Sequence, residues 1–317
     1  MNVETLLWIV FHVVVGAMLA VDLGVFQRTP HKLSMREAAI WSVVWIAAAL
    51  LFNAGVWALE GSQVALEWLT AYLVEKALSV DNLFVFLVIF AYFAVPDHLQ
   101  PRVLLWGVLG AVVMRASLIL VGVTLVKLFH WVLYFFGALL VYTGWKLFRH
   151  REETVDPSQN PVLQAVRRRF PVTETYLGGK FFVRREGKLW VTPLFLVLVV
   201  VESTDLMFAI DSIPAVLAIT HNLFTAYTSN IFAILGLRAL FFVLAGIMDM
   251  FRYLKYGLSL VLVFIGLKML VADFYKIPIG LSLGVVAVIL AVSVLASVLL
   301  PAPQEPSPEA SDASAGS

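Results

Sequence analysis

Two apolar stretches of the chain each carry a pair of acidic side chains at one spacing. The pairs are Glu75 with Asp81 and Asp205 with Asp211. Five residues separate the acids of each pair, and a small polar residue, Asn82 or Ser212, follows the second acid. A carboxylate placed in the hydrocarbon of a bilayer costs roughly 3 kcal/mol on insertion scales. Carboxylates repeated at matched positions despite this cost indicate a site that holds or relays cations.

The candidate ligands around these pairs are all oxygen donors. They are Glu75, Asp81, Asn82, Glu202, Asp205, Asp211 and Ser212. Neither stretch contains Cys or His, whereas zinc, copper and nickel sites usually recruit thiolate or imidazole. Oxygen sites suit Mg²⁺, Ca²⁺ and Mn²⁺, so we expect a divalent cation as the substrate and no organic cofactor. A contact from Met207 would favour manganese, although a methionine in an apolar helix is more often a packing residue.

Helical periodicity places the two acids of a pair on different faces. Six residues turn an α-helix through about 600°, which leaves Glu75 and Asp81 about 120° apart. Either each pair serves two sites, or its helix is unwound between the acids. Glu202 and Asp205 are three residues apart and share a face. Crowded buried carboxylates also exchange protons near neutral pH, which is compatible with proton coupling.

The elements that position these acids are expected to be apolar helices. Of the 317 residues 61% are hydrophobic, and the mean hydropathy is +0.93, which excludes an ordinary soluble domain. Cysteine is absent, which removes disulfides, thiolate ligands and thiol catalysis. The sequence predicts an all-α polytopic membrane protein with about nine transmembrane helices. Their approximate ranges are 5–26, 38–58, 68–94, 103–126, 131–148, 193–219, 229–248, 256–272 and 279–300.

The distribution of positive charge predicts the orientation. One set of alternate connections contains fifteen Lys and Arg residues, and the other contains two, Lys127 and Lys276. Connections rich in Lys and Arg stay in the cytoplasm. We therefore expect the bacterial inner (plasma) membrane, with the N-terminus outside and the C-terminus cytoplasmic.

Three sequence matches recur in the same order along the chain. The acidic pair recurs at an offset of 130 residues, and Arg115 is matched by Arg238. A Tyr, a Gly and a Lys also recur at identical spacing, first as Tyr134, Gly144 and Lys146 and then as Tyr256, Gly266 and Lys268. Each unit spans three helices, so the second unit enters the membrane upside down. Such an inverted three-plus-three repeat places a transporter's binding site at the repeat interface, near the membrane midplane.

This organisation divides the chain into six regions. They are an N-terminal two-helix segment (1–66), the first three-helix repeat (67–148), a basic cytoplasmic loop (149–192), the second, inverted repeat (193–272), the last helix (273–300) and a disordered tail (301–317). In the loop, alternating apolar and polar residues around Glu186 and Gly187 predict a short hairpin. The basic residues of the loop are expected to fix topology and to touch anionic lipid.

Three basic residues, Lys76, Arg115 and Arg238, lie within apolar segments. Each is expected to neutralise a buried acid. Arg115 and Arg238 lie on the helices that follow the two acidic stretches, where each can brace a carboxylate. We interpret them as structural counter-charges and not as ligands of the substrate.

Four motifs carry a family resemblance: DLGVF from Asp22, EKALSVDNLFVF from Glu75, FFVRREGKLWVTPLFLVLVVVESTDLMFAIDSIPA from Phe181, and GLKML from Gly266. Through these motifs the chain resembles the TerC/Alx family of integral membrane proteins over nearly its whole length, to about residue 300. The resemblance implies a nine-helix protein of the LysE-like transporter superfamily. It also implies an association with manganese efflux and, historically, with tellurium resistance.

The sequence and the resemblance together favour a secondary transporter that exports a divalent metal cation, manganese in particular, through a midplane carboxylate site. The expected partners are the metal ion, protons and the lipid bilayer, without nucleic acid. No enzymatic activity is expected: intramembrane aspartyl proteases also use two aspartates, but their Gly-x-Gly-Asp loop is missing at Asp81 and Asp211. The alternative is an envelope metal-loading or assembly factor linked to tellurite resistance, without transport of its own.

Overall fold

The computed structural model describes residues 3–27, 34–149, 157–185, 187–246 and 253–299. The predicted tail, 301–317, lies outside these residues. The helices are α1 (Val3–Gln27), α2 (Met35–Glu60), α3 (Ser62–Tyr92), α4 (Gln100–Leu128), α5 (Trp131–Arg149), η1 (Pro157–Gln159), α6 (Pro161–Arg169), α7 (Pro193–Leu217), α8 (Leu223–Ile234), α9 (Leu237–Gly246), α10 (Leu254–Leu270) and α11 (Ile279–Leu299). The strands are β1 (Phe182–Arg185) and β2 (Lys188–Val191).

Most of these helices are long and apolar enough to cross a bilayer. Six qualify by themselves, and the bent pair of α8 and α9 provides a seventh. Helix α3 is long enough, but it carries four charged residues, Glu67, Glu75, Lys76 and Asp81. Helix α10 has only 17 residues. The structure thus confirms an all-α polytopic membrane protein, whereas the number of nine spans stays a prediction.

The expected segment 229–248 is not one straight helix. It begins earlier, at Leu223, and is divided between α8 and α9, whose axes differ by 44°. Gly236 stands at the break with a φ of +85°, a conformation that glycine adopts without steric penalty. A Cβ atom at Gly236 would also lie 2.7 Å from the indole of Trp45. The break therefore has both a conformational and a packing cause.

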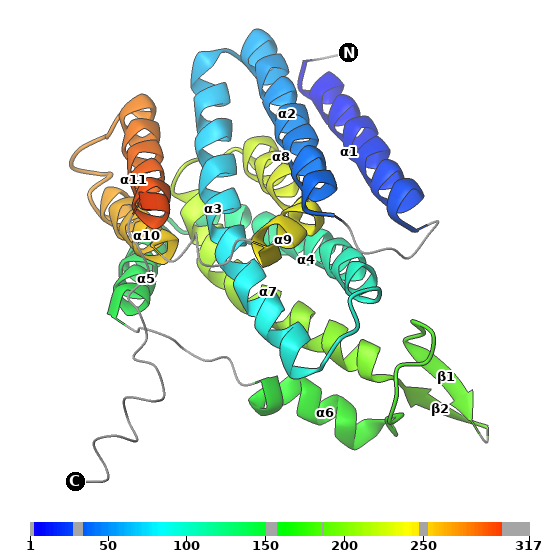
Figure 1. Cartoon of the computed structure of the whole chain (residues 1–317). Helices are drawn as coiled ribbons and strands as arrows, with labels where there is room; N and C mark the ends of the chain where they lie inside the picture. Colours follow the sequence, from blue (N-terminus) through cyan, green and yellow to red (C-terminus); the bar gives the residue numbers. More distant parts are fainter. Residues whose placement is uncertain (1–2, 28–33, 150–156, 186, 247–252, 300–317) are drawn as a thin grey trace, which may run out of the picture.

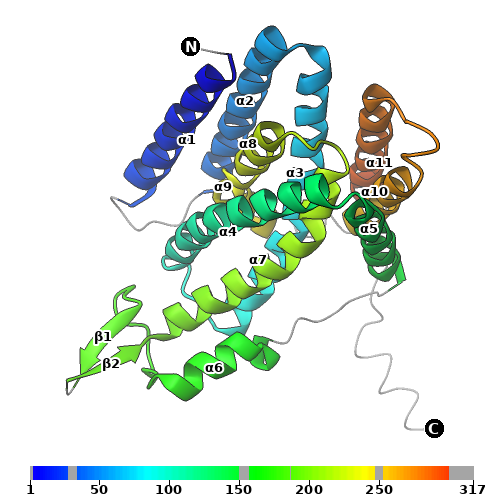
Figure 2. The same ribbon diagram turned by 180° about the vertical axis from the view of Figure 1, so that it is seen from behind.

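The bundle has two edges and a central group of helices. Helices α1 and α2 lie side by side at one edge, and α5, α10 and α11 lie together at the opposite edge (Figures 1 and 2). Two hydrophobic clusters fill the interior: one joins α1 and α2 to α8 and α9, and the other joins α5 and α10 to the second half of α7. Helices α3, α4 and α7 contribute to both clusters.

Helices α5 and α10 pack closely through small residues. Ser259 Oγ donates a 2.6 Å hydrogen bond to the carbonyl of Gly144. Seven residues away on each helix, a Cβ at Gly266 would lie 2.7 Å from the carbonyl of Gly137. Because Gly144 meets Ser259 while Gly137 meets Gly266, the two helices run antiparallel.

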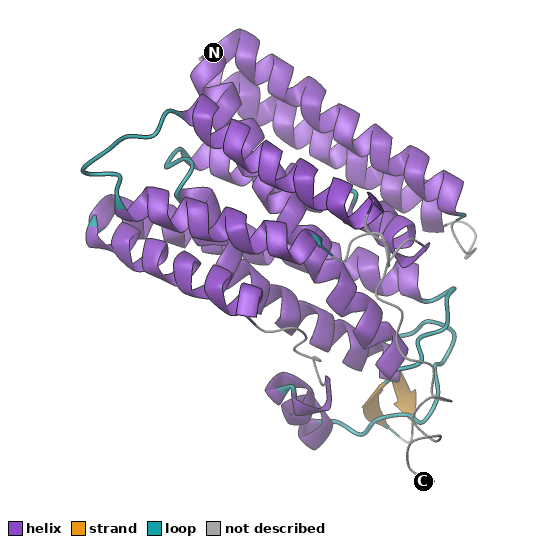
Figure 3. Ribbon diagram, turned by 60° about the vertical axis from the view of Figure 1, so that its left-hand side comes forward, coloured by secondary structure: helices purple, strands orange, loops and turns teal. Residues whose placement is uncertain are grey.

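The predicted hairpin is confirmed. Strands β1 and β2 pair antiparallel, with Phe182 opposite Val191 and Arg185 opposite Lys188. Gly187, in the turn, has a φ of +72°. The hairpin and α6 lie at one end of the bundle (Figure 3), and Asn160, the N-cap of α6, donates a 2.7 Å hydrogen bond to Ser203 of α7.

The close approach of α5 and α10 predicts that Gly266→Leu destabilises the protein. The new side chain would meet main-chain atoms of Gly137 and Val141, and overpacking typically costs about 1–3 kcal/mol. The measurement is thermal unfolding in detergent. Gly284→Leu on α11 is the control, because nothing lies within 4 Å of a Cβ at that position. Equal melting temperatures for the two variants would contradict the described packing.

Candidate cation site

A buried arginine joins the two predicted acidic helices. Arg115 of α4 forms an ion pair with Glu75 of α3, and it also contacts Asp205 of α7 through two nitrogen–oxygen pairs, Nη2–Oδ1 at 3.1 Å and Nε–Oδ2 at 3.3 Å. The side chains of Arg115 and Glu75 are fully buried, and that of Asp205 is 7% exposed. Arg115 Nη1 lies 3.3 Å from the hydroxyl of Ser212. The prediction that Arg115 braces acids of these helices is confirmed.

One carboxylate oxygen of the Glu75–Arg115–Asp205 bridge lacks a hydrogen-bond partner among the described residues. Glu75 Oε1 receives Arg115, with Ser79 Oγ 3.5 Å away, whereas Glu75 Oε2 has no hydrogen-bond partner among the described residues. Two carboxylates and one guanidinium give the bridge a formal charge of −1. Buried polar atoms are nearly always satisfied by protein, water or an ion. A buried, unsatisfied carboxylate oxygen is therefore a natural place for a cation or a water molecule.

The second acid of each pair, Asp81 or Asp211, interacts with a different helix from the first acid. Helices α3 and α7 are continuous through their acidic motifs, so the alternative of an unwound helix does not apply in this structure. Thr143 of α5 donates a 3.3 Å hydrogen bond to Asp211, and Lys146 on the same helix interacts with Asp211 electrostatically. Asp81 interacts in the same way with Lys255 of α10. The two acids of each pair thus point to different faces of their helix and have different neighbours, as helical periodicity predicts.

The carboxylate of Glu202 lies against α4. A Cβ atom on Gly110 would collide with this carboxylate, so Gly110 provides the room that Glu202 occupies. Glu202 and Asp205 also repel each other electrostatically. A negatively charged region therefore extends along α7 from the Glu75–Arg115–Asp205 bridge to Glu202.

The predicted ligands are distributed over several groups in this structure. Glu75, Asp205 and Ser212 gather around Arg115, while Asn82 is 4% exposed and follows Asp81 on α3. In the part of the chain that the structure describes, no three acidic or histidine side chains converge as a ready-made metal cluster. Joint ligation of one ion by the predicted set stays a prediction.

Two other residues differ from expectation. Lys76 was expected to neutralise an acid, but its amino group donates a 3.0 Å hydrogen bond to the carbonyl of Ala233, at the end of α8. The carbonyls at the end of a helix lack partners within the helix, and the break after α8 exposes them inside the protein. Met207 is 67% exposed on α7, so it neither packs in the interior nor lies among the buried acids. Arg238 is buried on α9, with 4% exposure.

Helix α8 contributes buried polar residues that the sequence analysis did not single out. Thr225, Thr228, Ser229 and Asn230 are fully buried, and Trp68 of α3 donates a 2.9 Å hydrogen bond to Thr228. Neither polar side-chain atom of Asn230 has a hydrogen-bond partner within the described ranges. The polar run from Tyr227 to Asn230 was the available signal, but the predicted segment began inside this run, at residue 229.

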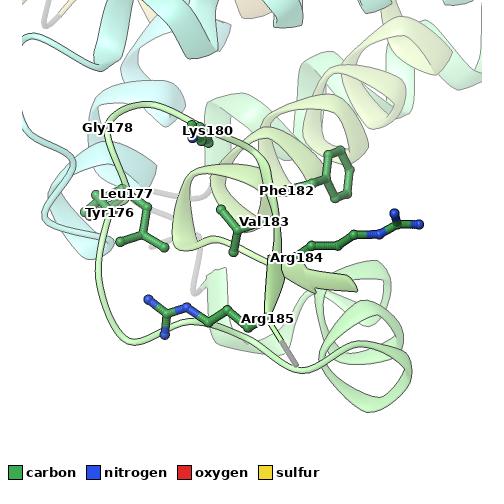
Figure 4. A pocket seen from close by; sticks show the side chains of 8 residues that line it. All are labelled: Tyr176, Leu177, Gly178, Lys180, Phe182, Val183, Arg184 and Arg185. Atoms are coloured by element: carbon green, nitrogen blue, oxygen red, sulfur yellow. The ribbon is translucent and has the colours of Figure 1, made fainter. Parts of the chain in front are cut away.

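A cavity of about 680 Å³ lies at the hairpin, outside the acidic region (Figure 4). Its lining includes Lys180, Arg184 and Arg185, together with aromatic and aliphatic side chains. Three positive charges make this cavity unsuitable for a metal cation. The acids on α3 and α7 therefore remain the candidate cation site.

Comparison with known proteins places this architecture in a family. The family model described as "Integral membrane protein TerC family" matches residues 60–305. The chain belongs to the TerC family. This TerC chain is 50% identical over 290 residues to a protein of Escherichia coli K12 named "Putative membrane-bound redox modulator Alx", covering 89% of this chain and 90% of that protein. It is also 48% identical over 293 residues to an uncharacterized membrane protein of Myxococcus xanthus, covering 92% of each. No solved structure matches this TerC chain.

The Glu75–Arg115–Asp205 bridge predicts strong energetic coupling between its members. Arg115→Met should lower the free energy of unfolding by about 3–5 kcal/mol, because it leaves buried carboxylates without their counter-charge. Adding Glu75→Gln should restore part of this loss, since one of those charges is then removed. Unfolding of both single variants and the double variant gives the coupling energy. Strictly additive losses would mean that the two side chains do not interact.

Proposed function

We propose that the chain is a secondary transporter that exports a divalent metal cation, with manganese as the favoured cargo, through carboxylates of α3 and α7. The observation that carries the proposal is the Glu75–Arg115–Asp205 bridge, with its one unsatisfied carboxylate oxygen. Two buried acids on facing helices have the chemistry of a hard-cation site. The arginine gives them a partner when no cation is bound.

Arg115 serves as an internal competitor of the cargo in this proposal. A cation that approaches Glu75 Oε2 is attracted by two carboxylates and repelled by the guanidinium. Binding is strong only when Arg115 moves away from one of the acids, so entry of the ion is coupled to a local rearrangement of α3, α4 and α7. Asp81 and Asp211, which lie further along the same helices, provide the next carboxylates on the path. Their neighbours Lys255 and Lys146 have the same counter-charge role.

We also propose nine spans, formed by the seven described above together with α3 and α10, and an inverted repeat of α3–α5 with α7–α10. The contact between α5 and α10 supports the repeat. The motif alignment equates Gly144 with Gly266, and the same offset of 122 residues equates Gly137 with Ser259. Since Gly144 meets Ser259 and Gly137 meets Gly266, exchanging the repeats reproduces the same pair of contacts. A two-fold axis generates this reciprocity.

The orientation proposed is an N-terminus outside and a C-terminus in the cytoplasm, in a bacterial inner membrane. The excess of Lys and Arg in alternate connections supports it. Manganese as the cargo relies on oxygen ligation and on family resemblance, since Met207 points outward. Coupling to protons fits a site built from carboxylates.

A second candidate is an envelope metal-loading or assembly factor, linked to tellurite resistance, that transports nothing by itself. The Escherichia coli relative is named a membrane-bound redox modulator, a description that does not require transport. This chain has no cysteine, so a redox role of its own would not use thiols. Absence of ion flux in liposomes that contain only this protein would favour the second candidate.

Asp81→Asn and Asp211→Asn should abolish or greatly reduce manganese uptake by inside-out vesicles, because each removes a charge and preserves volume. Uptake is measured with and without a proton gradient. Asp97→Asn is the control, since Asp97 is an exposed acid in the connection between α3 and α4. Site variants that fold normally and transport like the control would refute the site assignment.

The cysteine-free sequence allows a direct test of the inverted repeat. Single cysteines introduced at Lys127 and at Arg167 should react with an impermeant maleimide from opposite sides of the membrane, and a cysteine at Lys276 should react from the same side as that at Lys127. Labelling of intact spheroplasts and of inside-out vesicles distinguishes the sides. Labelling of Lys127→Cys and Lys276→Cys from opposite sides would rule out the proposed topology.

A further inference from the structure

Asn230 of α8 is a buried amide that the described part of the chain does not satisfy. The side chain is fully buried, and neither Nδ2 nor Oδ1 has a hydrogen-bond partner among the described residues. The two hydroxyls before it are satisfied, because Thr228 and Ser229 each donate a 2.7 Å hydrogen bond to a carbonyl of their own helix. An amide that is buried without a partner costs free energy, and bound water or an ion normally removes this cost. Asn230 therefore indicates a ligand that is not part of the protein chain.

Two hydrogen bonds place Asn230 at a similar depth to Glu75. They connect α3 to α8 on either side of Asn230: Trp68 donates to Thr228 at 2.9 Å, and Lys76 donates to the carbonyl of Ala233 at 3.0 Å. Residue numbers rise in the same direction along both helices, so α3 and α8 run parallel at this contact. Asn230 lies between the two acceptors on α8, and Glu75 lies between the two donors on α3.

The face of α8 that carries Asn230 borders the junction of α3, α4 and α7. Helix α8 packs on both α3 and α4 (Figures 1 and 2). Ala226 is four residues before Asn230, so the two side chains share a face of the helix. Ala226 belongs to the hydrophobic cluster that also contains residues of α3, α4 and α7.

The three members of the Glu75–Arg115–Asp205 bridge have the same relation to this cluster. The cluster contains one residue from each helix of the bridge: Ala71 of α3, Ile119 of α4 and Ala209 of α7. Each of these residues is four positions from the bridge member on its own helix. Asn230 and the three charged residues thus all lie one helical turn from the same apolar cluster, which places the amide beside the bridge.

The end of α8 provides negative partial charge close to Asn230. The helix ends at Ile234, the break follows at Gly236, and residues 231–234 are buried. The last carbonyls of a helix lack partners within the helix and form the negative end of its dipole. Lys76 places its amino group on one of them, the carbonyl of Ala233, so this end of α8 accommodates a positive charge. Half-helix C-terminal ends hold cations in transporters in the same way.

We propose that Asn230 is a further ligand of the transported divalent cation, and that its Oδ1 binds the ion together with Glu75 Oε2. This role rests on the proposed function, transport of a divalent cation. Both atoms are buried oxygens without a hydrogen-bond partner among the described residues, and they come from helices that pack on each other. Amide oxygens are common ligands of hard divalent cations. A neutral amide also adds an oxygen without adding a charge that Arg115 would pair with.

The variant Asn230→Leu separates a ligand from a packing residue. Leucine has a similar volume and no polar atoms. Binding of Mn²⁺ to the purified full chain in detergent is measured from the electron paramagnetic resonance signal of free Mn²⁺, and thermal unfolding is measured with a chelator present. We expect Mn²⁺ binding to weaken about tenfold or more. The metal-free melting temperature should stay equal or rise, because a buried amide without a partner is removed.

Ser229→Ala is the matched control on the same helix. It removes a fully buried hydroxyl that already has a partner, the carbonyl of Thr225, and it should leave Mn²⁺ affinity unchanged. Equal weakening in Ser229→Ala and Asn230→Leu would overturn the ligand role, because it would indicate a general disturbance of α8.

Two further substitutions at Asn230 test the need for an oxygen. Asn230→Ala removes the amide without adding bulk and should weaken Mn²⁺ binding as much as leucine does. Asn230→Asp keeps an oxygen and adds a charge, so it should bind Mn²⁺ at least as tightly as the parent chain. Binding by the aspartate variant as weak as that of the leucine variant would contradict coordination through oxygen.

The binding measurement also distinguishes this role from the proposed function. A parent chain that binds Mn²⁺, with leucine and alanine variants of equal affinity, would overturn the ligand role of Asn230 and leave the proposed function in place. A parent chain that binds no Mn²⁺ would overturn both.

Discussion

The structure depends on the neutralisation of negative charge in an apolar interior. Arg115 stands where three helices meet, and along α4 and α7 it and Asp205 mark the change from one hydrophobic cluster to the other. Along α4 and α7 a polar layer thus separates the two apolar clusters, whereas along α3 and α8 the clusters adjoin. Charged groups in such a layer are tolerable only when each has a partner, and the partners come from different helices. The ion bridge therefore dictates how α3, α4 and α7 are placed relative to one another.

Other polar contacts extend this layer toward the edges of the bundle. Lys76 reaches α8, Thr143 reaches α7, and Trp68 donates to Thr228. Each contact crosses between helices far apart in sequence. In a bilayer, where lipid is as apolar as the helix surfaces, side-chain hydrogen bonds and close packing of small residues select the partner of each helix. The antiparallel contact of α5 with α10 does this through glycines and Ser259, without any charge.

Much of this arrangement could be predicted from sequence because hydropathy and charge are strong local signals. Eight of the nine predicted spans each coincide with one helix, the hairpin forms around Gly187, and Arg115 contacts acids of both stretches. The partners of single polar side chains could not be predicted. Lys76 is adjacent to Glu75 in the chain, but a helix turns neighbouring residues by about 100°, so Lys76 points to α8 while Glu75 points to Arg115. The break at Gly236 was also missed, since a lone glycine in an apolar run does not distinguish a bend from a close contact.

The division of one span into α8 and α9 has a mechanical consequence. Helix α8 is held against α1 and α2 by aromatic contacts, including Trp8 with Phe224 and Phe52 with Phe232. Helix α9 has its own contact, between Phe241 and Phe90 of α3. Both halves also pack on α3, and α3 donates two hydrogen bonds to α8, from Trp68 to Thr228 and from Lys76 to the carbonyl of Ala233. A movement of α3 is therefore transmitted to both halves, and Gly236, which lies against Trp45 of α2 at the 44° bend, is the joint at which the angle between them changes.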